Sequence, residues 1–347
     1  LCEEVICFDL NLKKINELKK GLINIEEKNL KEKLKKYNKK IFFTDNIEKL
    51  KKCDFIYLSV DTKTINNIID LKEVKKYINI FKANFSQNKS LVILSQLPFD
   101  FIKRSNLEKN KNINIQVETL IFGNAVERFL KPERIIFGTE NNVIQKKIYS
   151  FLKKFKCPII KMDRQSALLT KMSINLYLAS QVTVTNFLSA ICEKSNAKWE
   201  PIKLALSLDK RIGKSSYLSP GLGLSGGNIE RDLFNLNELC NKKKLKNKIV
   251  ESIIYDSNNR KKWIEKIFNK LQNNKNFKYS ILGISYKSGT DSVKNSPAIE
   301  LIKKFRKTSF YIYDPLVKST QIKLSNANLE NKISKIFLNS NVIILMN

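Results

Sequence analysis

The segment DFIYLSV, residues 54–60, decides the fold class of this chain. Most of its side chains are apolar and it stops at a polar turn, which is typical of a strand buried on both faces. The segments VICFD (residues 5–9) and SLVIL (residues 90–94) have the same character, and helical spacing of apolar residues lies between them, including residues 66–85. Strands that alternate with helices predict a parallel sheet covered on both faces. The N-terminal part of the chain is therefore predicted to be an α/β domain.

The remainder of the chain changes character twice. Residues 166–194 contain no Gly or Pro and keep an apolar periodicity, so they are predicted to form one long helix. The loop SPGLGLSGG (residues 219–227) then holds four of the ten glycines, which indicates close backbone approach to a ligand or another segment. The strands YSILGI (residues 279–284) and VIILM (residues 342–346) belong to a second α/β pattern. The predicted domains are residues 1–163, 164–272 and 273–347.

The composition excludes several kinds of chemistry. The chain has no histidine, so Ser-His-Asp hydrolysis, Cys-His proteolysis and histidine-ligated metal chemistry are closed. Its six cysteines form no C-x-x-C pair, so no metal is predicted, and reduced thiols of a cytoplasmic protein are expected. No apolar run reaches the roughly 18–20 residues needed to span a membrane, and no signal peptide is expected.

The formal net charge of +31 raises the alternative of a nucleic-acid-binding protein. The lysines are spread along the whole chain, however, and no arginine-rich arm or aromatic-studded basic stripe accompanies them. We interpret the charge as a compositional bias with lysines on solvated faces, and nucleic acid is not expected to be the main partner. A basic surface still attracts anionic ligands such as sugar nucleotides.

Asp9 ends the strand of residues 5–9, where a dinucleotide-binding sheet carries the acid that holds a ribose hydroxyl. By itself this signal is weak, because acids often cap strands. The Gly-rich phosphate-binding loop of such a sheet lies before this strand, and the sequence begins too late to include it. That loop and the first strand are therefore missing from this sequence: their presence upstream of Leu1 would complete the cofactor site, and their absence would argue against NAD binding.

Four stretches, in order along the chain, carry a resemblance to a known family. They are residues 9–62; FLKPERIIFG (129–138); residues 168–194 with DKRIG (209–213) and the Gly-rich loop; and GISYK (283–287) with TDSVKNSPA (290–298). The ordered set resembles the UDP-glucose and GDP-mannose dehydrogenase family.

The resemblance implies two Rossmann-like parallel-sheet domains joined by a long central helix that also builds a homodimer. The N-terminal domain would hold NAD, and the C-terminal domain, which is expected to be incomplete here, would hold a UDP-sugar. Enzymes of this family serve polysaccharide biosynthesis and oxidise a sugar CH₂OH group to a carboxylate with two NAD, through a cysteine-bound intermediate. The chain is therefore expected to be an NAD-dependent dehydrogenase that acts at C6 of a UDP-glucose-like nucleotide sugar.

Four residues match the family's catalytic groups. Lys171 and Asn175 lie four apart in the predicted long helix, so both point to one face and can donate hydrogen bonds to an oxyanion. Spacing alone favours a solvated lysine and a surface asparagine, whereas the resemblance favours the catalytic pair. The resemblance also implies that Asp232 acts with a water as part of the base, and that Glu118 activates water for the final hydrolysis.

The resemblance further assigns residues to the two ligands. Those assigned to NAD are Asp9, Lys14, Ser59, Val60, Thr62 and Ser95. Those assigned to the sugar nucleotide are Arg211, which would reach a neighbouring subunit's site, and Gly223, Gly226, Lys287 and Lys294. Lys294 stands where the family has an Arg, which removes bidentate geometry.

Asn228 occupies the place of the family's nucleophilic cysteine. An amide cannot form a thiohemiacetal or a thioester. Cys240 follows three turns along the predicted helix, roughly 18 Å away by helical rise, so it is no easy substitute. Three outcomes are therefore open: a dehydrogenase of altered chemistry, which is the main expectation, a relative that binds NAD and sugar nucleotide without turnover, or a decaying copy.

Overall fold

A computed structural model describes residues 4–23, 25, 27–62, 64, 65, 68–85, 89–121, 123–141, 144–272, 277–338 and 340–347. The chain divides into two compact units, Leu1–Lys171 and Met172–Asn347. The domain boundary expected at residue 273 falls on residues outside the described part of the chain.

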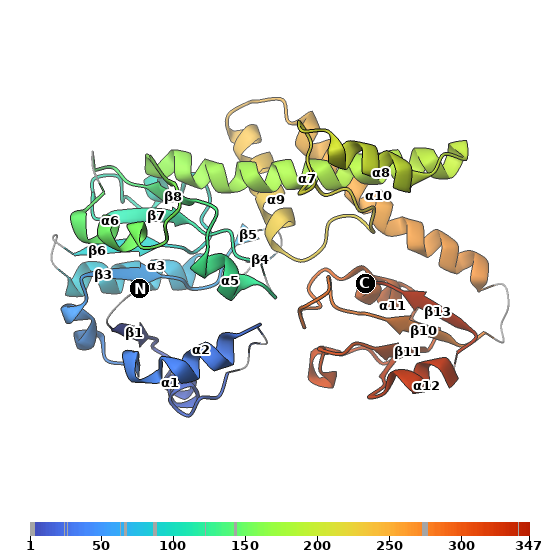
Figure 1. The fold of residues 1–347 in the computed structure, drawn as a ribbon, viewed down its shortest axis with the longest axis horizontal. Coiled ribbons are helices and arrows are strands. Elements are labelled where there is room, and N and C mark those ends of the chain that lie inside the picture. The colour runs from blue at the N-terminus through green and yellow to red at the C-terminus, as the bar shows by residue number, and fades with distance from the viewer. Residues whose placement is uncertain are drawn as a thin grey trace. The chain divides into compact units, whose positions relative to one another are not determined.

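The first unit is built on two main sheets (Figure 1). A parallel pair joins β1 (Val5–Phe8) to β2 (Ile41–Thr44). The second sheet has the order β3-β6-β7-β8-β9, and its pairings are parallel except for the antiparallel pair β7–β8. Its strands are β3 (Phe55–Leu58), β6 (Ser90–Ile93), β7 (Ile113–Val117), β8 (Ile135–Gly138) and β9 (Ile159–Met162). The helices of this unit are α1 (Leu12–Lys19), α2 (Leu30–Lys36), α3 (Lys72–Asn84), α4 (Phe101–Arg104), α5 (Ala125–Leu130) and α6 (Lys146–Lys153).

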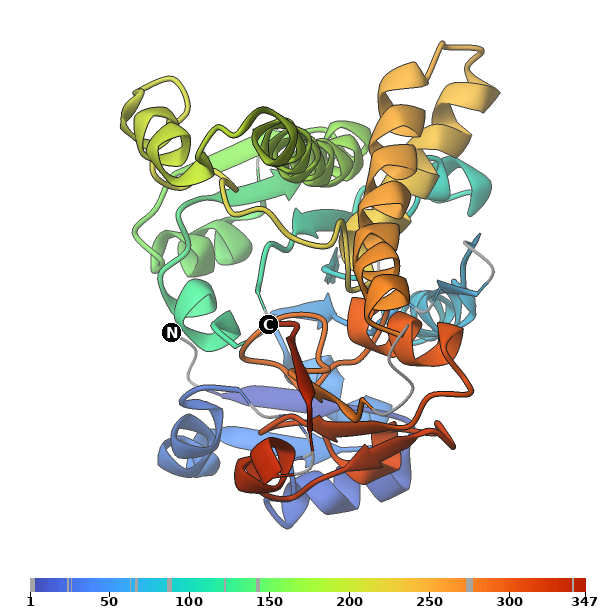
Figure 2. The ribbon, with the colours of Figure 1, turned by 90° about the vertical axis from the view of Figure 1, so that its right-hand side faces the viewer.

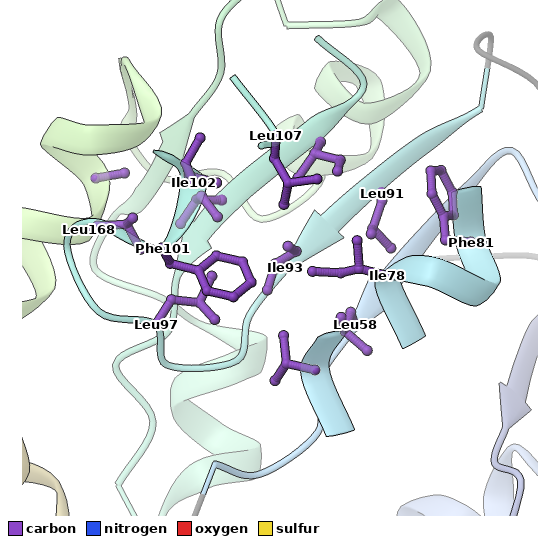
Figure 3. Packing of buried hydrophobic residues seen from close by; sticks show 14 residues of the cluster. Leu58, Ile78, Phe81, Leu91, Ile93, Leu97, Phe101, Ile102, Leu107 and Leu168 are labelled. Carbon is purple, nitrogen blue, oxygen red and sulfur yellow. The ribbon is translucent and has the colours of Figure 1, made fainter. Parts of the chain in front are cut away.

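Helix α3 packs on the five-stranded sheet through one apolar face (Figure 3). Val74, Ile78 and Phe81 are three or four residues apart, so they share that face, and all three are buried. They belong to one core cluster with Leu58 of β3 and Leu91 of β6. Burial of each such side chain contributes about 1.5–3 kcal/mol relative to exposure. This packing fixes α3 against β3 and β6.

Arg164, the first residue of α7 (Arg164–Ser195), is buried despite its charge. Its guanidinium donates to the carbonyl oxygens of Leu107 (3.1 Å), Glu108 (2.9 Å) and Asn110 (2.9 Å), and to the Glu140 carboxylate (3.0 Å). A buried charge is costly unless it is paired and hydrogen-bonded. These bonds therefore hold the start of α7 against the segment that precedes β7.

The second unit contains most of α7 and the C-terminal sheet. Its helices α9 (Asn228–Lys242) and α10 (Lys248–Leu271) lie side by side (Figure 2). The other helices are α8 (Trp199–Leu208), α11 (Pro297–Lys304) and α12 (Ile333–Leu338). The sheet is parallel throughout, with the order β12-β11-β10-β13. Its strands are β10 (Tyr279–Leu282), β11 (Phe310–Tyr313), β12 (Ala327–Leu329) and β13 (Val342–Leu345). The order reverses between β10 and β13, and ligands of α/β sheets bind at the carboxyl ends of strands at such a switch point.

The expected fold class is confirmed: the chain is an α/β protein with two parallel-sheet units and a long central helix, α7. One expected helix is wrong at its start, because α3 begins at Lys72 and not at residue 66. The antiparallel pair β4 (Thr64–Ile65) and β5 (Ile68–Ile69) precedes it, as suits β-branched residues. The Asp70 carboxylate then accepts a hydrogen bond from the Lys72 backbone nitrogen (3.0 Å), which favours a helix start there.

Candidate active site

Asn175 of α7 and Asp232 of α9 form a buried polar pair. Asn175 is 6% exposed and Asp232 is fully buried. The side-chain amide of Asn175 donates a hydrogen bond to the Asp232 carboxylate. A buried carboxylate needs donors to offset its lost hydration, so this bond stabilises Asp232. The structure thus brings these two predicted catalytic residues into direct contact.

Lys171 and Glu118 meet within the first unit. The Lys171 Nζ donates to the main-chain carbonyl oxygen of Glu118 at 2.5 Å. The Glu118 carboxylate accepts from the backbone nitrogen of Leu120. Burial raises the pKa of the Glu118 carboxyl, while the positive charges of Lys171 and Arg128 act in the opposite direction. A carboxyl with a raised pKa exchanges protons closer to neutral pH, which suits an acid–base role.

The two pairs are connected through α7, which is continuous from Arg164 to Ser195. Lys171 and Asn175 are four residues apart on it, so their side chains leave the same face of the helix on successive turns. The sequence predicted this spacing, and α7 realises it.

Asn228 is the first residue of α9 and follows the Gly-rich loop. Its side-chain oxygen accepts a hydrogen bond from the Arg231 Nη2 at 3.0 Å. Arg231 is buried, whereas Asn228 is exposed. The first residue of this helix therefore carries an exposed amide whose oxygen is hydrogen-bonded to a buried guanidinium group.

The glycines of the loop are required by close packing within the second unit. Gly223 and Gly226 have φ of 84° and 85°, a left-handed backbone that favours glycine. A Cβ on Gly223 would lie 2.5 Å from the Ser257 carbonyl oxygen, and one on Gly226 would lie 2.9 Å from the Tyr286 ring. Glycine is therefore the residue that these two positions accept.

Lys294 lies against the same loop. A Cβ on Gly227 would meet the Lys294 Nζ at 2.7 Å, so the ammonium group lies close to the start of α9. The Ser225 hydroxyl donates to the Tyr286 carbonyl oxygen (3.2 Å), which ties the loop to the segment after β10. Of the residues predicted for the sugar nucleotide, Lys294, Gly223 and Gly226 are therefore gathered around one loop.

Asp9 follows β1 and is held by three donors. Its carboxylate accepts from the Lys14 Nζ (2.6 Å), the Asn11 backbone nitrogen (3.0 Å) and the Tyr77 hydroxyl (3.3 Å). Partial burial acts to raise the pKa of Asp9, but the bond from Lys14 and the bonds from Asn11 and Tyr77 outweigh it, so the pKa is lowered. Asp9 therefore presents an ionised acceptor at the end of its strand.

The other residues predicted for NAD lie just after β3 and β6. Ser59, Val60 and Thr62 follow β3, and Ser95 follows β6. The Ser95 hydroxyl donates to the Val60 carbonyl oxygen (2.7 Å), so the two strand ends are bonded to each other. An ionised Asp9 can still accept from ribose hydroxyls, because a carboxylate has about four lone-pair sites. The residues present thus fit the ribose end of a dinucleotide at the carboxyl edge of the strands.

Lys287 belongs to the segment that follows β10 at the switch point of the C-terminal sheet. Asp314 accepts from the backbone nitrogens of Ile284 (2.9 Å) and Ser285 (3.0 Å), and these bonds shape the segment. The Lys287 carbonyl oxygen accepts from the Ser285 hydroxyl (3.0 Å). The remaining predicted residue, Arg211, lies elsewhere in this unit: it is exposed and bonds its own neighbour Asp209 through Nε and Nη2.

Sequence reasoning missed two residues that hold predicted site residues, one in each unit. Arg231 could have been found, because it stands three residues after Asn228 on a predicted helix, where side chains meet. Tyr77 could not have been found, because it reaches Asp9 across 68 positions of sequence.

These features define a class of protein. One unit carries an acid at the end of a parallel strand, as dinucleotide-binding sheets do, and the other carries a parallel sheet with a switch point. A buried Asp–Asn pair lies on the helices that precede the second sheet. Together they are features of a nicotinamide-dependent dehydrogenase with two nucleotide-binding units.

The chain belongs to the UDP-glucose/GDP-mannose dehydrogenase family. The NAD binding domain of the family matches residues 2–156, the central domain residues 165–260, and the UDP binding domain residues 280–347. The expected function, NAD-dependent dehydrogenation of a nucleotide sugar, is thereby confirmed, and the ligands are NAD and a UDP-sugar.

Individual relatives agree with this membership. The chain is 31% identical over 350 residues to UDP-glucose 6-dehydrogenase of Rickettsia bellii, covering 95% of this chain and 80% of the relative. It is 25% identical over 328 residues to UDP-glucose 6-dehydrogenase TuaD of Bacillus subtilis, covering 90% and 71%. A UDP-glucose dehydrogenase from Pyrobaculum islandicum has the same fold, with a TM-score of 0.88 at 20% identity over 99% of this chain and 84% of that one.

Among the described helices, none combines the length and the apolar character that crossing a bilayer requires.

Proposed function

We propose that this chain oxidises the C6 hydroxymethyl group of UDP-glucose, or of a closely similar UDP-sugar, with NAD and without a covalent bond between sugar and enzyme. The observation that carries this proposal is the Asn175–Asp232 contact on α7 and α9, with Asn228 at the start of α9. UDP-glucose is the choice because relatives near 30% identity are named UDP-glucose 6-dehydrogenases.

Hydrogen-bond capacity supports the roles of the α7 residues. Asn175 has two amide hydrogens, of which one goes to Asp232, so the other can reach the C6 oxygen. Lys171 carries a positive charge one helical turn before Asn175, and its Nζ donates to the Glu118 carbonyl oxygen. A cation and an amide hydrogen are groups that stabilise the negative charge of an alkoxide that develops at C6. Asp232, through a water, accepts the hydroxyl proton.

The cofactor supplies the acceptor for the hydride that leaves C6. On the protein side, Asp9 would hold a ribose hydroxyl, with Lys14 and Tyr77 keeping its carboxylate in place. The residues after β3 and β6, Ser59, Val60, Thr62 and Ser95, would line the adjoining edge.

The second oxidation needs an oxygen from water if no thiol adds to the aldehyde. Water adds to the C6 carbonyl to give a hydrate, and loss of a hydride and two protons from that hydrate gives the carboxylate. Together the two oxidations consume two NAD and one water, and they release two NADH and three protons. Glu118, whose pKa is raised by burial, is the proposed base for the addition of water. Cys240 cannot replace the thiol, because twelve residues of helix separate it from Asn228, roughly 18 Å.

We also propose that the chain acts as a homodimer in the cytoplasm. Large apolar side chains are exposed on α7 and α8, among them Tyr177 (72%), Phe187 (60%) and Leu208 (62%). Exposed apolar surface of this kind marks an interaction site, and a second copy is the partner that the family relationship supplies. In such a dimer the exposed Arg211 would reach the partner's sugar nucleotide.

The test is a turnover assay with purified protein, UDP-glucose and NAD, in which absorbance at 340 nm is compared with the C6 product. We expect two NADH for each carboxylate, with no loss of rate after iodoacetamide treatment. Binding of both ligands without NADH formation would instead support the second candidate, a non-catalytic relative, which the absence of a nucleophile at residue 228 favours. No reduction of NAD with any UDP- or GDP-sugar would contradict the proposal.

A further inference from the structure

The bond between Asn228 and Arg231 fixes which end of the Asn228 amide points outward. A guanidinium group can only donate hydrogen bonds, so the atom facing the Arg231 Nη2 at 3.0 Å must be the amide oxygen. The amide nitrogen with its two hydrogens then points away from Arg231. Among the residues that the structure describes, Arg231 is the one group bonded to the Asn228 side chain.

Burial separates the two members of this pair. Arg231 is 5% exposed, whereas Asn228 is open to solvent at the start of α9. The amide nitrogen is therefore available to a bound molecule. The nearby Lys294 ammonium, which lies against Gly227, gives the same place positive charge.

We propose that Asn228 donates a hydrogen bond to the C6 oxygen of the bound sugar, and that Arg231 is the positioning residue that fixes its amide in the donating orientation. This inference rests on the proposed function and specifies its C6 site. Residue 228 would then not form a bond to C6, as a nucleophile does. Its amide would instead donate a hydrogen bond that stabilises negative charge on the oxygen of C6. No covalent step occurs at Asn228 itself.

Such a donor serves both oxidations. In the first, it faces the alkoxide that forms as the hydroxyl proton leaves. In the second, it faces the oxygen of the aldehyde as water adds to the carbon. A neutral donor fixed before the reaction stabilises these oxygens more than the uncharged alcohol, so its removal lowers kcat more than it raises KM.

The kinetic test compares Asn228→Ala, Arg231→Met and the double variant. Removal of one oxyanion donor lowers kcat by about 10²–10³-fold. We expect Asn228→Ala to show a loss of this size with KM changed by less than about threefold. Arg231→Met should lower kcat in the native background and add little in the Asn228→Ala background, because its role is exerted through Asn228. Asn241→Ala, at the exposed end of the same helix, is the matched control.

Arg231→Lys keeps the charge and should recover part of the loss, which a purely structural role of the long side chain would not produce. Equal losses from Arg231→Met in both backgrounds would overturn the positioning role. If Arg231→Met does not fold, Asn228→Asp tests the donor role instead, because a carboxylate still accepts a hydrogen bond from Arg231 but has no hydrogen to donate. A wild-type kcat in Asn228→Asp would overturn the donor role.

A binding experiment separates this inference from the proposed function. Isothermal titration calorimetry would measure UDP-glucuronate, which has oxygens on C6, and UDP-xylose, which lacks C6. We expect Asn228→Ala to weaken UDP-glucuronate by about tenfold or more, the effect of one hydrogen bond to a charged group, and to leave UDP-xylose unchanged. An equal change for both nucleotides, or none for either, would overturn the donor role even in an active enzyme. A selective loss in a protein that never reduces NAD would support the donor and contradict only the turnover.

Discussion

Replacement of Asn175 by Asp tests the central contact of the candidate site. In Asn175→Asp, the amide that donates to Asp232 becomes a second carboxyl group against a side chain that is fully buried. Two carboxylates in contact cannot both ionise, so one of the pair must hold a proton. Loss of the donor beside a buried carboxylate costs about 3 kcal/mol. For a unit of this size, that corresponds to a Tm lower by about 6–12 °C.

The loss should depend on pH with a definite sign. The retained proton means that one carboxyl of the variant has a pKa above its unfolded value of about 3.9. Such a group contributes most to the stability of the folded state at pH values below its unfolded pKa, and this contribution is lost as the pH rises through the raised pKa. The Tm difference between wild type and Asn175→Asp should therefore be largest near pH 8 and shrink toward pH 5.

Differential scanning calorimetry across this pH range provides the measurement. Asn186→Asp is a matched control on the same helix, because its side-chain oxygen already accepts a hydrogen bond from the Gly221 backbone nitrogen at 2.7 Å. A carboxylate can take over that bond, so the control should lose less Tm. A Tm difference for Asn175→Asp that is the same at pH 5 and pH 8 would refute the reasoning, because it would mean that no second ionised carboxylate lies against residue 175.

Three further predictions concern the ligands and the chemistry. Asp9→Asn should raise the KM for NAD by about tenfold, because a charged acceptor for the ribose is lost, and an unchanged KM would contradict the assignment. The depressed pKa of Asp9 implies that the native bond to Lys14 persists at neutral pH and weakens only in acid. Glu118→Gln should slow carboxylate formation and remove the acid limb from the pH profile of that rate. Because the pKa of Glu118 is raised, this limb should lie above the usual glutamate pKa of about 4.3, and a limb that remains in the variant would exclude Glu118 as the base. Cys240→Ser should keep full activity, and a large loss would show that this thiol takes part after all.

The sequence predicts the parts of the fold that depend on local pattern. Helix α7 follows from a stretch without Gly or Pro, and its bounds Arg164–Ser195 exceed the predicted ones by only a few residues. The antiparallel pairing of β7 with β8 could not be predicted from local pattern. Both strands are short apolar runs, and their relative direction depends on the connection between them. The start of α3 was misplaced for a related reason: apolar residues before Lys72 fit a helix by spacing but form β5 instead.

The residues of the candidate site were selected by the family resemblance and not by local geometry. Lys171 and Asn175 are one helical turn apart and Asp9 ends a strand, but spacing alone favours a solvated lysine and a surface asparagine, and an acid at a strand end is common. The partners that hold these groups are distant in sequence. Tyr77 bonds Asp9 across 68 positions, and Asp232 bonds Asn175 across 57, so only the folded chain shows which hydrogen bonds remain available to a ligand.

Residue 228 illustrates why site chemistry cannot be inferred from one side chain. An asparagine has no thiol with which to form a covalent intermediate, yet the features around Asn228 suit negative charge on a ligand oxygen. The start of the fifteen-residue helix α9 offers partial positive charge, and the ammonium of Lys294 lies beside it. Arg231 adds a constraint on orientation, since it takes the amide oxygen and leaves the amide hydrogens for the substrate. The chemistry proposed for this place therefore needs only hydrogen-bond donors and positive charge, which the start of α9, Lys294 and the oriented Asn228 amide supply.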